Sequence, residues 1–164
     1  MRRHILFLCL VCFYLFTGSQ LLAAEPTLVK ITGGLGEQEG AAALQRAIER
    51  QRGVGSPTRI VLAGLFVLHQ PVRLTAQNRN ISIEAENSSP AELVAANGAM
   101  RAIEVIGSAN VRVAGLKVIG FASDGIFVAD ASRVIIEGNT VRETRSRAWS
   151  QGAIHLTGNV AGAM

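Results

Sequence analysis

Apolar residues along most of this chain come in pairs separated by one other residue, and one set of pairs recurs at a fixed spacing. Ile103 and Val105 are followed 23 residues later by Ile126 and Val128. The same spacing joins Val111 to Val134, Val113 to Ile136, Gly115 to Gly138 and Val118 to Val141. Side chains at i and i+2 share one face of a strand. A period in the twenties carried by such pairs predicts a stacked repeat architecture.

From Arg59 onward the pairs fall into three columns, with Gly, Asn and Ser between them. The first column holds Ile60, Ile81, Val111 and Val134; the second holds Val72, Ile103, Ile126 and Ile154; the third holds Leu116, Val118 and Val141. Loops such as Glu86 to Glu92 and Arg145 to Gly152 take up the insertions between repeats. We therefore expect an all-β solenoid of about four coils with three strands each, stacked at ~4.8 Å.

Helical periodicity occurs once in the mature chain, in EGAAALQRAIERQRG. Ala43, Leu44, Ala47 and Ile48 fall on one face, and Gly53 ends the pattern. The pattern predicts an amphipathic helix over residues 39–52, after an entry segment at 25–37. A helix of this length is marginal alone, so we expect it to cap the first coil of a β-solenoid domain spanning residues 38–164.

The first 24 residues have the pattern of a secretory signal peptide. Arg2 and Arg3 precede an apolar run from Ile5 to Phe16, and Ala23-Ala24 supplies a small-residue cleavage site. The run is shorter than the ~20 residues of a membrane span, so we expect no stable span after cleavage, with an uncleaved anchor as the alternative. The sequence therefore predicts a secreted or periplasmic protein exported by the general secretory route.

Removal of this signal changes the composition of the chain. Both cysteines, Cys9 and Cys12, lie inside it, so the mature chain has no thiol for a disulfide, a metal ligand or covalent catalysis. Arg2 and Arg3 leave as well, and the formal net charge falls from +4 to +2. No basic stripe interleaved with aromatic residues is present, and we expect no nucleic-acid partner.

The order of these segments resembles a known family. AAALQRAIERQ is followed by RIVLAGLFVLHQPVRL, NISIEAE, SANVRVAGLKVIG and DASRVIIEGNTV. This order resembles the N-terminal part of a right-handed parallel β-helix of the pectate-lyase-like (pectin lyase fold) superfamily. The resemblance covers nearly all of residues 38–160. It implies a right-handed coil, an N-terminal capping helix and a polysaccharide as partner.

Such proteins bind polysaccharides along an outer face, so the residues between the apolar pairs are the candidates for binding. In the second column these are Arg73, Glu104, Phe127 and His155, one from each successive coil. At ~5 Å spacing they form a polar and aromatic stripe that can follow a sugar chain. The alternative is an ordinary solvated face with one exposed phenylalanine. Trp149, in the insertion, is either a sugar-stacking platform or packs that loop down.

The catalytic candidates are Asp124, Asp130, Arg133 and His155. Asp124 and Asp130 are the only aspartates, but they flank one strand and stand ~20 Å apart at full extension, too far for paired glycosidase carboxylates. Both also suit turns. The resemblance implies a calcium ion and a basic residue for a lyase, but no aspartate cluster supplies calcium ligands, and the sequence indicates no cofactor.

Two functions remain open from the sequence. The first is a protein that binds or processes polysaccharide, as a lyase or a glycoside hydrolase if it is an enzyme. The alternative is a non-catalytic structural or adhesive β-helix module. No second cap follows the fourth coil before Met164, so we expect either further coils beyond this sequence or self-association at that end.

Overall fold

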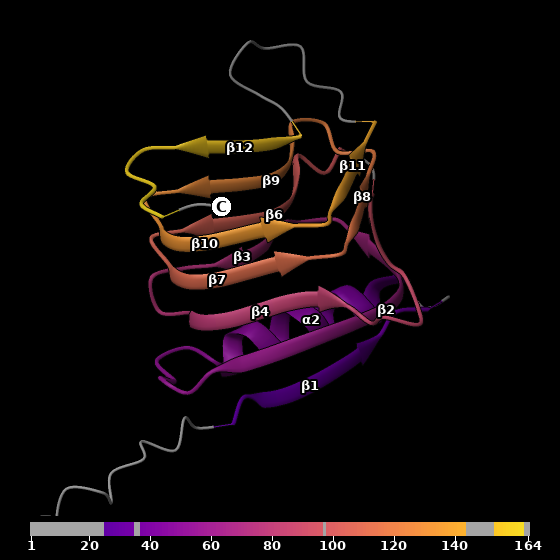
Figure 1. The fold of residues 1–164 in the computed structure, drawn as a ribbon. Helices are drawn as coiled ribbons and strands as arrows, with labels where there is room; N and C mark the ends of the chain where they lie inside the picture. Colours follow the sequence, from indigo (N-terminus) through magenta and orange to yellow (C-terminus); the bar gives the residue numbers. More distant parts are fainter. Residues whose placement is uncertain (1–24, 35–36, 97, 144–152, 163–164) are drawn as a thin grey trace, which may run out of the picture.

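The computed structural model describes residues 25–34, 37–96, 98–143 and 153–162, which form a stack of parallel strands with one helix near its N-terminal end (Figure 1). In chain order the elements are β1 (Thr27–Thr32), α2 (Glu37–Arg50), β2 (Thr58–Leu68), β3 (Val72–Leu74), β4 (Arg79–Ala85), β5 (Ala91–Ala95), β6 (Arg101–Ile106), β7 (Ala109–Ala114), β8 (Lys117–Ile119), β9 (Asp124–Ala129), β10 (Ser132–Glu137), β11 (Thr140–Arg142) and β12 (Ile154–Thr157).

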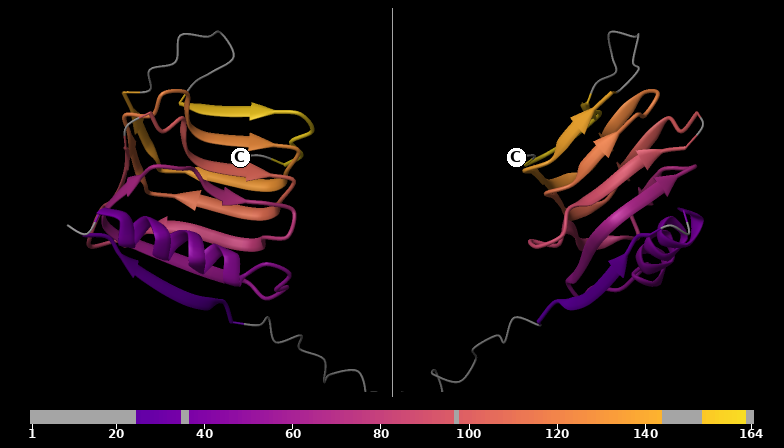
Figure 2. Two further views of the ribbon diagram at one scale, coloured as in Figure 1. Left: turned by 180° about the vertical axis from the view of Figure 1, so that it is seen from behind. Right: turned by 90° about the vertical axis from the view of Figure 1, so that its right-hand side faces the viewer.

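Three parallel sheets run along this stack. Sheet A contains β1, the first half of β2, β4, β7 and β10. Sheet B contains the second half of β2, β5, β8 and β11, and sheet C contains β3, β6, β9 and β12. The chain visits sheets A, B and C in turn, so each circuit is one coil (Figure 2). The expected parallel β-solenoid of about four coils is confirmed.

The strand register confirms the second and third columns and corrects the first. Val72, Ile103, Ile126 and Ile154 are successive partners in sheet C, and Val118 is the partner of Val141. In sheet A, however, Ile81 lies beside Thr58, and Ile60 lies beside Ile83. The slip is two residues. It keeps every side chain on the same face, so the apolar pattern alone does not detect it.

Two strands were missed by the sequence analysis. β1 lies in the entry segment at 25–37, for which no strand was predicted, and β5 begins inside the loop expected at Glu86 to Glu92. β1 pairs only with β2 among the described strands, and most of its side chains are exposed or half-buried. A strand with so little buried surface does not need a regular alternation of apolar and polar residues, so the hydrophobic pattern did not identify it.

Helix α2 begins and ends two residues before the range predicted for it. Leu44 and Ile48 are fully buried and belong to the same core as the strands. Gly53 follows with a φ of 74°, a left-handed conformation suited to glycine after a helix. The buried Asn78 side chain donates a hydrogen bond to the Ile48 carbonyl at 2.8 Å, so a helix-terminal acceptor is satisfied from the first turn of the solenoid.

The core is the set of inward columns. Ile103, Val105, Ile126 and Val128 are fully buried, and each such side chain stabilises the fold by ~1.5–3 kcal/mol relative to exposure. In the last coil, Ile154 and Leu156 lie directly beside Ile126 and Val128 but are 45% and 47% exposed. Burial of a column therefore depends on having a coil on both sides.

Candidate functional site

The four residues expected to form an outer stripe lie in one row across sheet C. Arg73 of β3 is the strand partner of Glu104 of β6, Glu104 is the partner of Phe127 of β9, and Phe127 is the partner of His155 of β12. Each alternates with two inward apolar residues of its strand. The row therefore crosses the strands and follows the solenoid axis.

At one end of this row, two arginines bind the carboxylate of Glu104. Arg73 Nε donates a hydrogen bond to Glu104 Oε2 at 2.8 Å, and the Arg73 side chain is 63% exposed. Arg101, the first residue of β6, donates from Nη1 to Glu104 Oε1 at 3.2 Å. Glu104 is itself buried and accepts from two guanidinium groups. These charge-assisted bonds hold its carboxylate in one orientation.

Asp124 provides a second, fully buried carboxylate beside the row. Its Oδ2 accepts hydrogen bonds from Arg101 Nε at 2.8 Å and from Ser123 Oγ at 3.0 Å. Its Oδ1 lies 3.5 Å from Nδ1 of His155. That distance suits an ion pair when the imidazole is protonated, but the geometry is not that of a hydrogen bond, and the buried Nδ1 has no hydrogen-bond partner among the described residues.

Phe127 carries the aromatic surface of the row. The Arg101 guanidinium carbon lies 3.8 Å from the centre of its ring, a cation–π contact. The His155 ring meets Phe127 edge-on, with ring centres 5.2 Å apart and planes at 83°. Since both neighbours touch the ring, its orientation is fixed by packing on the outer face.

We call these six residues, Arg73, Arg101, Glu104, Asp124, Phe127 and His155, the sheet C cluster. Two arginines balance two carboxylates in charge, and His155 adds an imidazole beside Asp124. The cluster combines fixed hydrogen-bond donors and acceptors with an aromatic surface.

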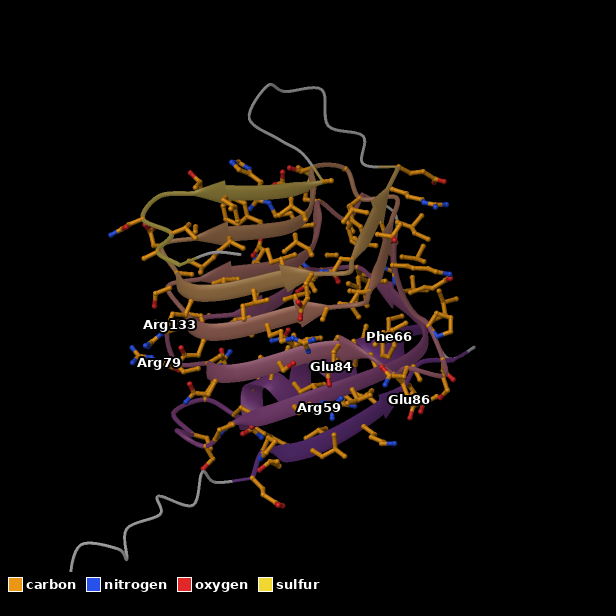
Figure 3. The ribbon with its side chains drawn as sticks, viewed as in Figure 1. Arg59, Phe66, Arg79, Glu84, Glu86 and Arg133 are labelled. Atoms are coloured by element: carbon orange, nitrogen blue, oxygen red, sulfur yellow. The ribbon has the colours of Figure 1, made fainter. Side chains whose placement is uncertain are left out.

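The remaining candidates lie elsewhere or outside the described residues. Asp130 is at the opposite end of β9 from Asp124, has a φ of 49°, and accepts a hydrogen bond from the Asn159 amide at 3.0 Å. Arg133 belongs to β10 of sheet A, at the start of that strand (Figure 3). Neither belongs to the sheet C cluster. Trp149 lies outside the described residues.

The sequence analysis missed Arg101 altogether. It lies 23 residues before Asp124, the period of the repeat, and the two are strand partners. That spacing would have identified the pair. However, the alternation places both residues on the inward side, with Ile103 and Ile126. Only the folded chain shows that they lie at the starts of their strands, where Arg101 contacts Glu104 and Phe127 of the outer face.

A second set of ion pairs on sheet A provides a comparison. Glu84 lies beside Arg59 (Figure 3) and pairs with both Arg59 and Arg112. Arg112 Nη2 also lies 2.6 Å from Glu137 Oε1. We call these four residues the sheet A ladder. It joins successive coils as the sheet C cluster does, but includes no aromatic ring and no histidine. Ion pairing between coils is thus a general feature of this surface, and Phe127 with His155 distinguishes sheet C.

The described residues do not fit a calcium site. They contain no group of three or more His, Cys, Asp or Glu side chains placed to hold a metal ion. Glu104 and Asp124 are each bonded to arginine, whereas calcium takes six to eight oxygen ligands. The chemistry available at the cluster is hydrogen bonding and aromatic contact.

No protein-family model, curated protein or solved structure matches the chain. Among the described residues, no helix has the length and apolar character needed to cross a membrane. The fold and the site by themselves define the protein as a parallel β-solenoid with a polar and aromatic row on one sheet.

Proposed function

We propose that this protein is an exported polysaccharide-binding β-helix, right-handed and of pectate-lyase-like ancestry, that holds a glycan along the sheet C cluster. One observation carries the proposal: Arg73, Glu104, Phe127 and His155 are successive partners across four strands. Adjacent strands are ~4.8 Å apart, so Arg73, Phe127 and His155 stand along the path of an extended chain, and the buried Glu104 orients Arg73. Polar groups then read hydroxyls, and Phe127 contacts a sugar face.

The test compares two arginines with matched surroundings. Arg73 is 63% exposed and pairs with Glu104 of the next coil, and Arg59 is 51% exposed and pairs with Glu84 of the next coil. Binding of the purified chain is measured by affinity electrophoresis in gels containing polygalacturonate, alginate, mannan or β-glucan. We expect retardation by at least one polymer, weakened at least tenfold in Phe127→Ala and Arg73→Ala and unchanged in Arg59→Ala.

Either of two results would overturn the proposal. One is an absence of binding to every polymer by a chain whose circular dichroism shows folded β-structure. The other is equal loss in the Arg73→Ala and Arg59→Ala variants, which would assign both arginines to general stability. In either case the non-catalytic structural module, built from inter-coil ion pairs, becomes the better description of sheet C.

Processing of the bound glycan is a second candidate, favoured by the contact between His155 and Asp124. Asp124 Oδ1 and His155 Nδ1 are 3.5 Å apart and form no hydrogen bond in this structure. Catalytic hydrogen bonds are often long without substrate and shorten when it binds, and in that state Asp124 would orient His155 as a general acid or base. If the protein is a lyase or hydrolase, incubation with the bound polymer releases unsaturated or reducing ends, and His155→Gln abolishes the release. Binding without new ends restricts the protein to the binding role.

Export is tested separately from binding. The first 24 residues lie outside the described part of the chain, and their proposed role is that of a signal removed after Ala24. The intact mass of protein recovered from the outside of the inner membrane is expected to correspond to an N-terminus at Glu25. An N-terminus at Met1 in membrane-bound protein would show an anchor instead.

A further inference from the structure

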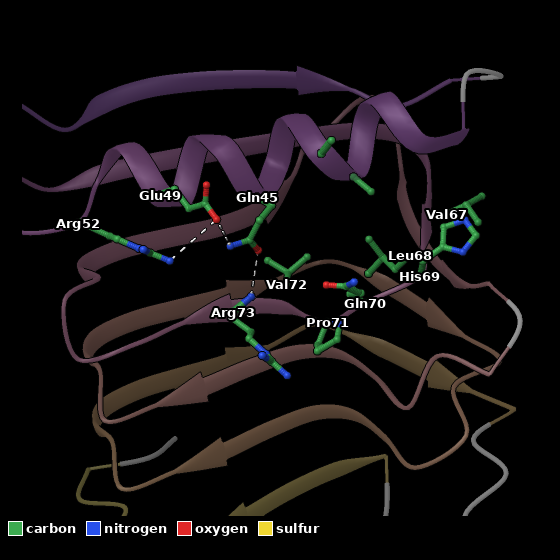
Figure 4. Close-up of a pocket in the computed structure, with 12 residues that line it drawn as sticks. Gln45, Glu49, Arg52, Val67, Leu68, His69, Gln70, Pro71, Val72 and Arg73 are labelled. Atoms are coloured by element: carbon green, nitrogen blue, oxygen red, sulfur yellow. Dashed lines mark hydrogen bonds and ion pairs between the residues drawn. The ribbon is translucent and has the colours of Figure 1, made fainter.

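A cleft with a volume of 560 Å³ lies at the end of the sheet C cluster (Figure 4). One wall is α2 and the turn after it, with Gln45, Glu49 and Arg52. The opposite wall is residues 67–73, which comprise the end of β2, the turn after it and the start of β3 with Arg73. Arg73 therefore belongs to both the cleft and the cluster, so the two are continuous.

Helix α2 occupies the position beside β3 that a further strand of sheet C would take. β3 pairs with β6 along one edge. On the other side the Arg73 amide donates a hydrogen bond to Gln45 Oε1 of the helix at 3.2 Å (Figure 4). A glycan that follows the row toward the N-terminal end of the solenoid thus meets α2 directly after Arg73. The row therefore ends at the helix, and the cleft lies beside that end.

The lining of the cleft suits one sugar residue better than a charged group. Ala41 and Ala42 on the helix and Pro71 and Val72 on the turn leave apolar surface and room. His69 and Gln70 are exposed on the turn. On the helix side Glu49 accepts a hydrogen bond from Gln45 at 3.2 Å and lies 3.9 Å from Arg52.

The charged groups on the helix wall therefore face one another, and Gln45 is bonded to Glu49 and to the Arg73 amide. The exposed Gln70 amide and His69 imidazole on the opposite wall are the groups left to contact a ligand. Small-ligand sites of ~300–1,000 Å³ have this composition, a mostly apolar lining with a few polar groups.

We propose that this cleft is a terminal subsite, which receives the end residue of a polysaccharide and reads it through its hydroxyls. The proposal rests on the glycan-binding function of the sheet C cluster. It adds that the protein recognises chain ends: the row holds the adjoining sugars, and α2 prevents the chain from continuing. One protein then binds per chain end, irrespective of chain length.

The experiment counts binding sites per gram of polymer as chain length changes. The polymer is the one that retards the chain in the electrophoresis experiment, used intact and after partial acid hydrolysis to one-tenth of its mean length. Isothermal titration of the purified chain with each sample gives the number of sites. We expect about tenfold more sites per gram after hydrolysis, because the number of ends rises by that factor. An unchanged number of sites per gram would overturn the terminal subsite and leave the binding function intact.

Two variants of adjacent helix residues provide the structural control. Ala42 lines the cleft and Ala43 does not. Ala42→Trp fills the cleft, and we expect it to weaken binding of the hydrolysed polymer at least fivefold, whereas Ala43→Trp leaves binding unchanged. Circular dichroism and unfolding establish that both variants fold; if Ala42→Trp does not, Gln70→Ala replaces it. Equal affinity of the folded cleft variant and wild type would also overturn the subsite, and loss of binding only in Phe127→Ala would locate the whole site on sheet C.

Discussion

At the scale of single residues, the two aspartates show how position decides role. Asp124 is fully buried, accepts hydrogen bonds from Arg101 and Ser123, and lies 3.5 Å from His155. Asp130 is exposed at a turn and accepts one amide hydrogen bond. Asp124 is the first residue of β9 and Asp130 follows its last, and both had suited turns in the sequence. The difference arises from Arg101, which the preceding coil places beside only one of them.

We predict that Asp124→Asn lowers the free energy of unfolding by about 2 kcal/mol, because the buried amide carries no charge to pair with Arg101 and has one acceptor oxygen where the carboxylate has two. The measurement is urea unfolding followed by circular dichroism. Asp130→Asn is the matched control, and we expect a change below ~0.5 kcal/mol, since asparagine tolerates the left-handed turn and keeps an acceptor. Equal effects of the two substitutions would contradict the role assigned to Asp124.

At the scale of elements, β2 joins two sheets because of one glycine. Thr58–Ala63 of this strand pairs with β1 and β4, and the residues from Gly64 to Leu68 pair with β5. Gly64 has a φ of 87°, and a Cβ there would lie 2.5 Å from the carbonyl oxygen of Gly33. Both the conformation and the close approach require glycine, so the corner of the first coil depends on this residue.

Replacing Gly64 with alanine is expected to destabilise the protein by at least ~1–2 kcal/mol, from the left-handed conformation alone. Gly55→Ala serves as the control, since a Cβ at Gly55 meets nothing within 4 Å. Its expected effect is within ~1 kcal/mol and in the stabilising direction, because alanine restricts the unfolded chain. Thermal unfolding of both variants measures the two effects. No loss of stability in Gly64→Ala would show that the corner of the first coil does not require glycine.

Much of the element order could be predicted from the sequence, and part of the candidate site as well. The repeat of Ile103 at Ile126 identified the strands of sheet C and with them the row from Arg73 to His155. The slip of Ile60 by two residues could not be predicted, because side-chain faces repeat every two residues. Arg101 was missed because its alternation places it in the core. The cleft was missed because it forms between α2 and residues 67–73, which are separate in the sequence and are not related by the repeat.

At the scale of the whole molecule, stability depends on how many neighbours each coil has. Ile126 and Ile154 are strand partners, yet Ile126 is fully buried and Ile154 is 45% exposed. The third coil lies between two others, and the fourth has a neighbour on one side among the described residues. In a solenoid such nearest-neighbour contacts add almost linearly.

Truncation of these two isoleucines is expected to have unequal effects. Ile126→Ala should lower the free energy of unfolding by about 2–5 kcal/mol, because it leaves a cavity in the packed core. Ile154→Ala should cost about 1 kcal/mol, because roughly half of its apolar surface is already exposed. Urea unfolding of the two variants compares them under identical conditions. A cost for Ile154→Ala equal to that for Ile126→Ala would mean that the fourth coil is covered in solution.

The sequence by itself determined the solenoid, because the physical cause of the fold is local and periodic: apolar pairs at i and i+2 must be buried, and stacking buries them. It also determined the outward row of sheet C, since alternation assigns each residue a face. Only the tertiary structure decided which charges meet. Arg101 reaches Asp124 and Phe127, and α2 ends the row beside Arg73, because these contacts depend on how the strand starts and the helix pack in space, which no period along the chain encodes.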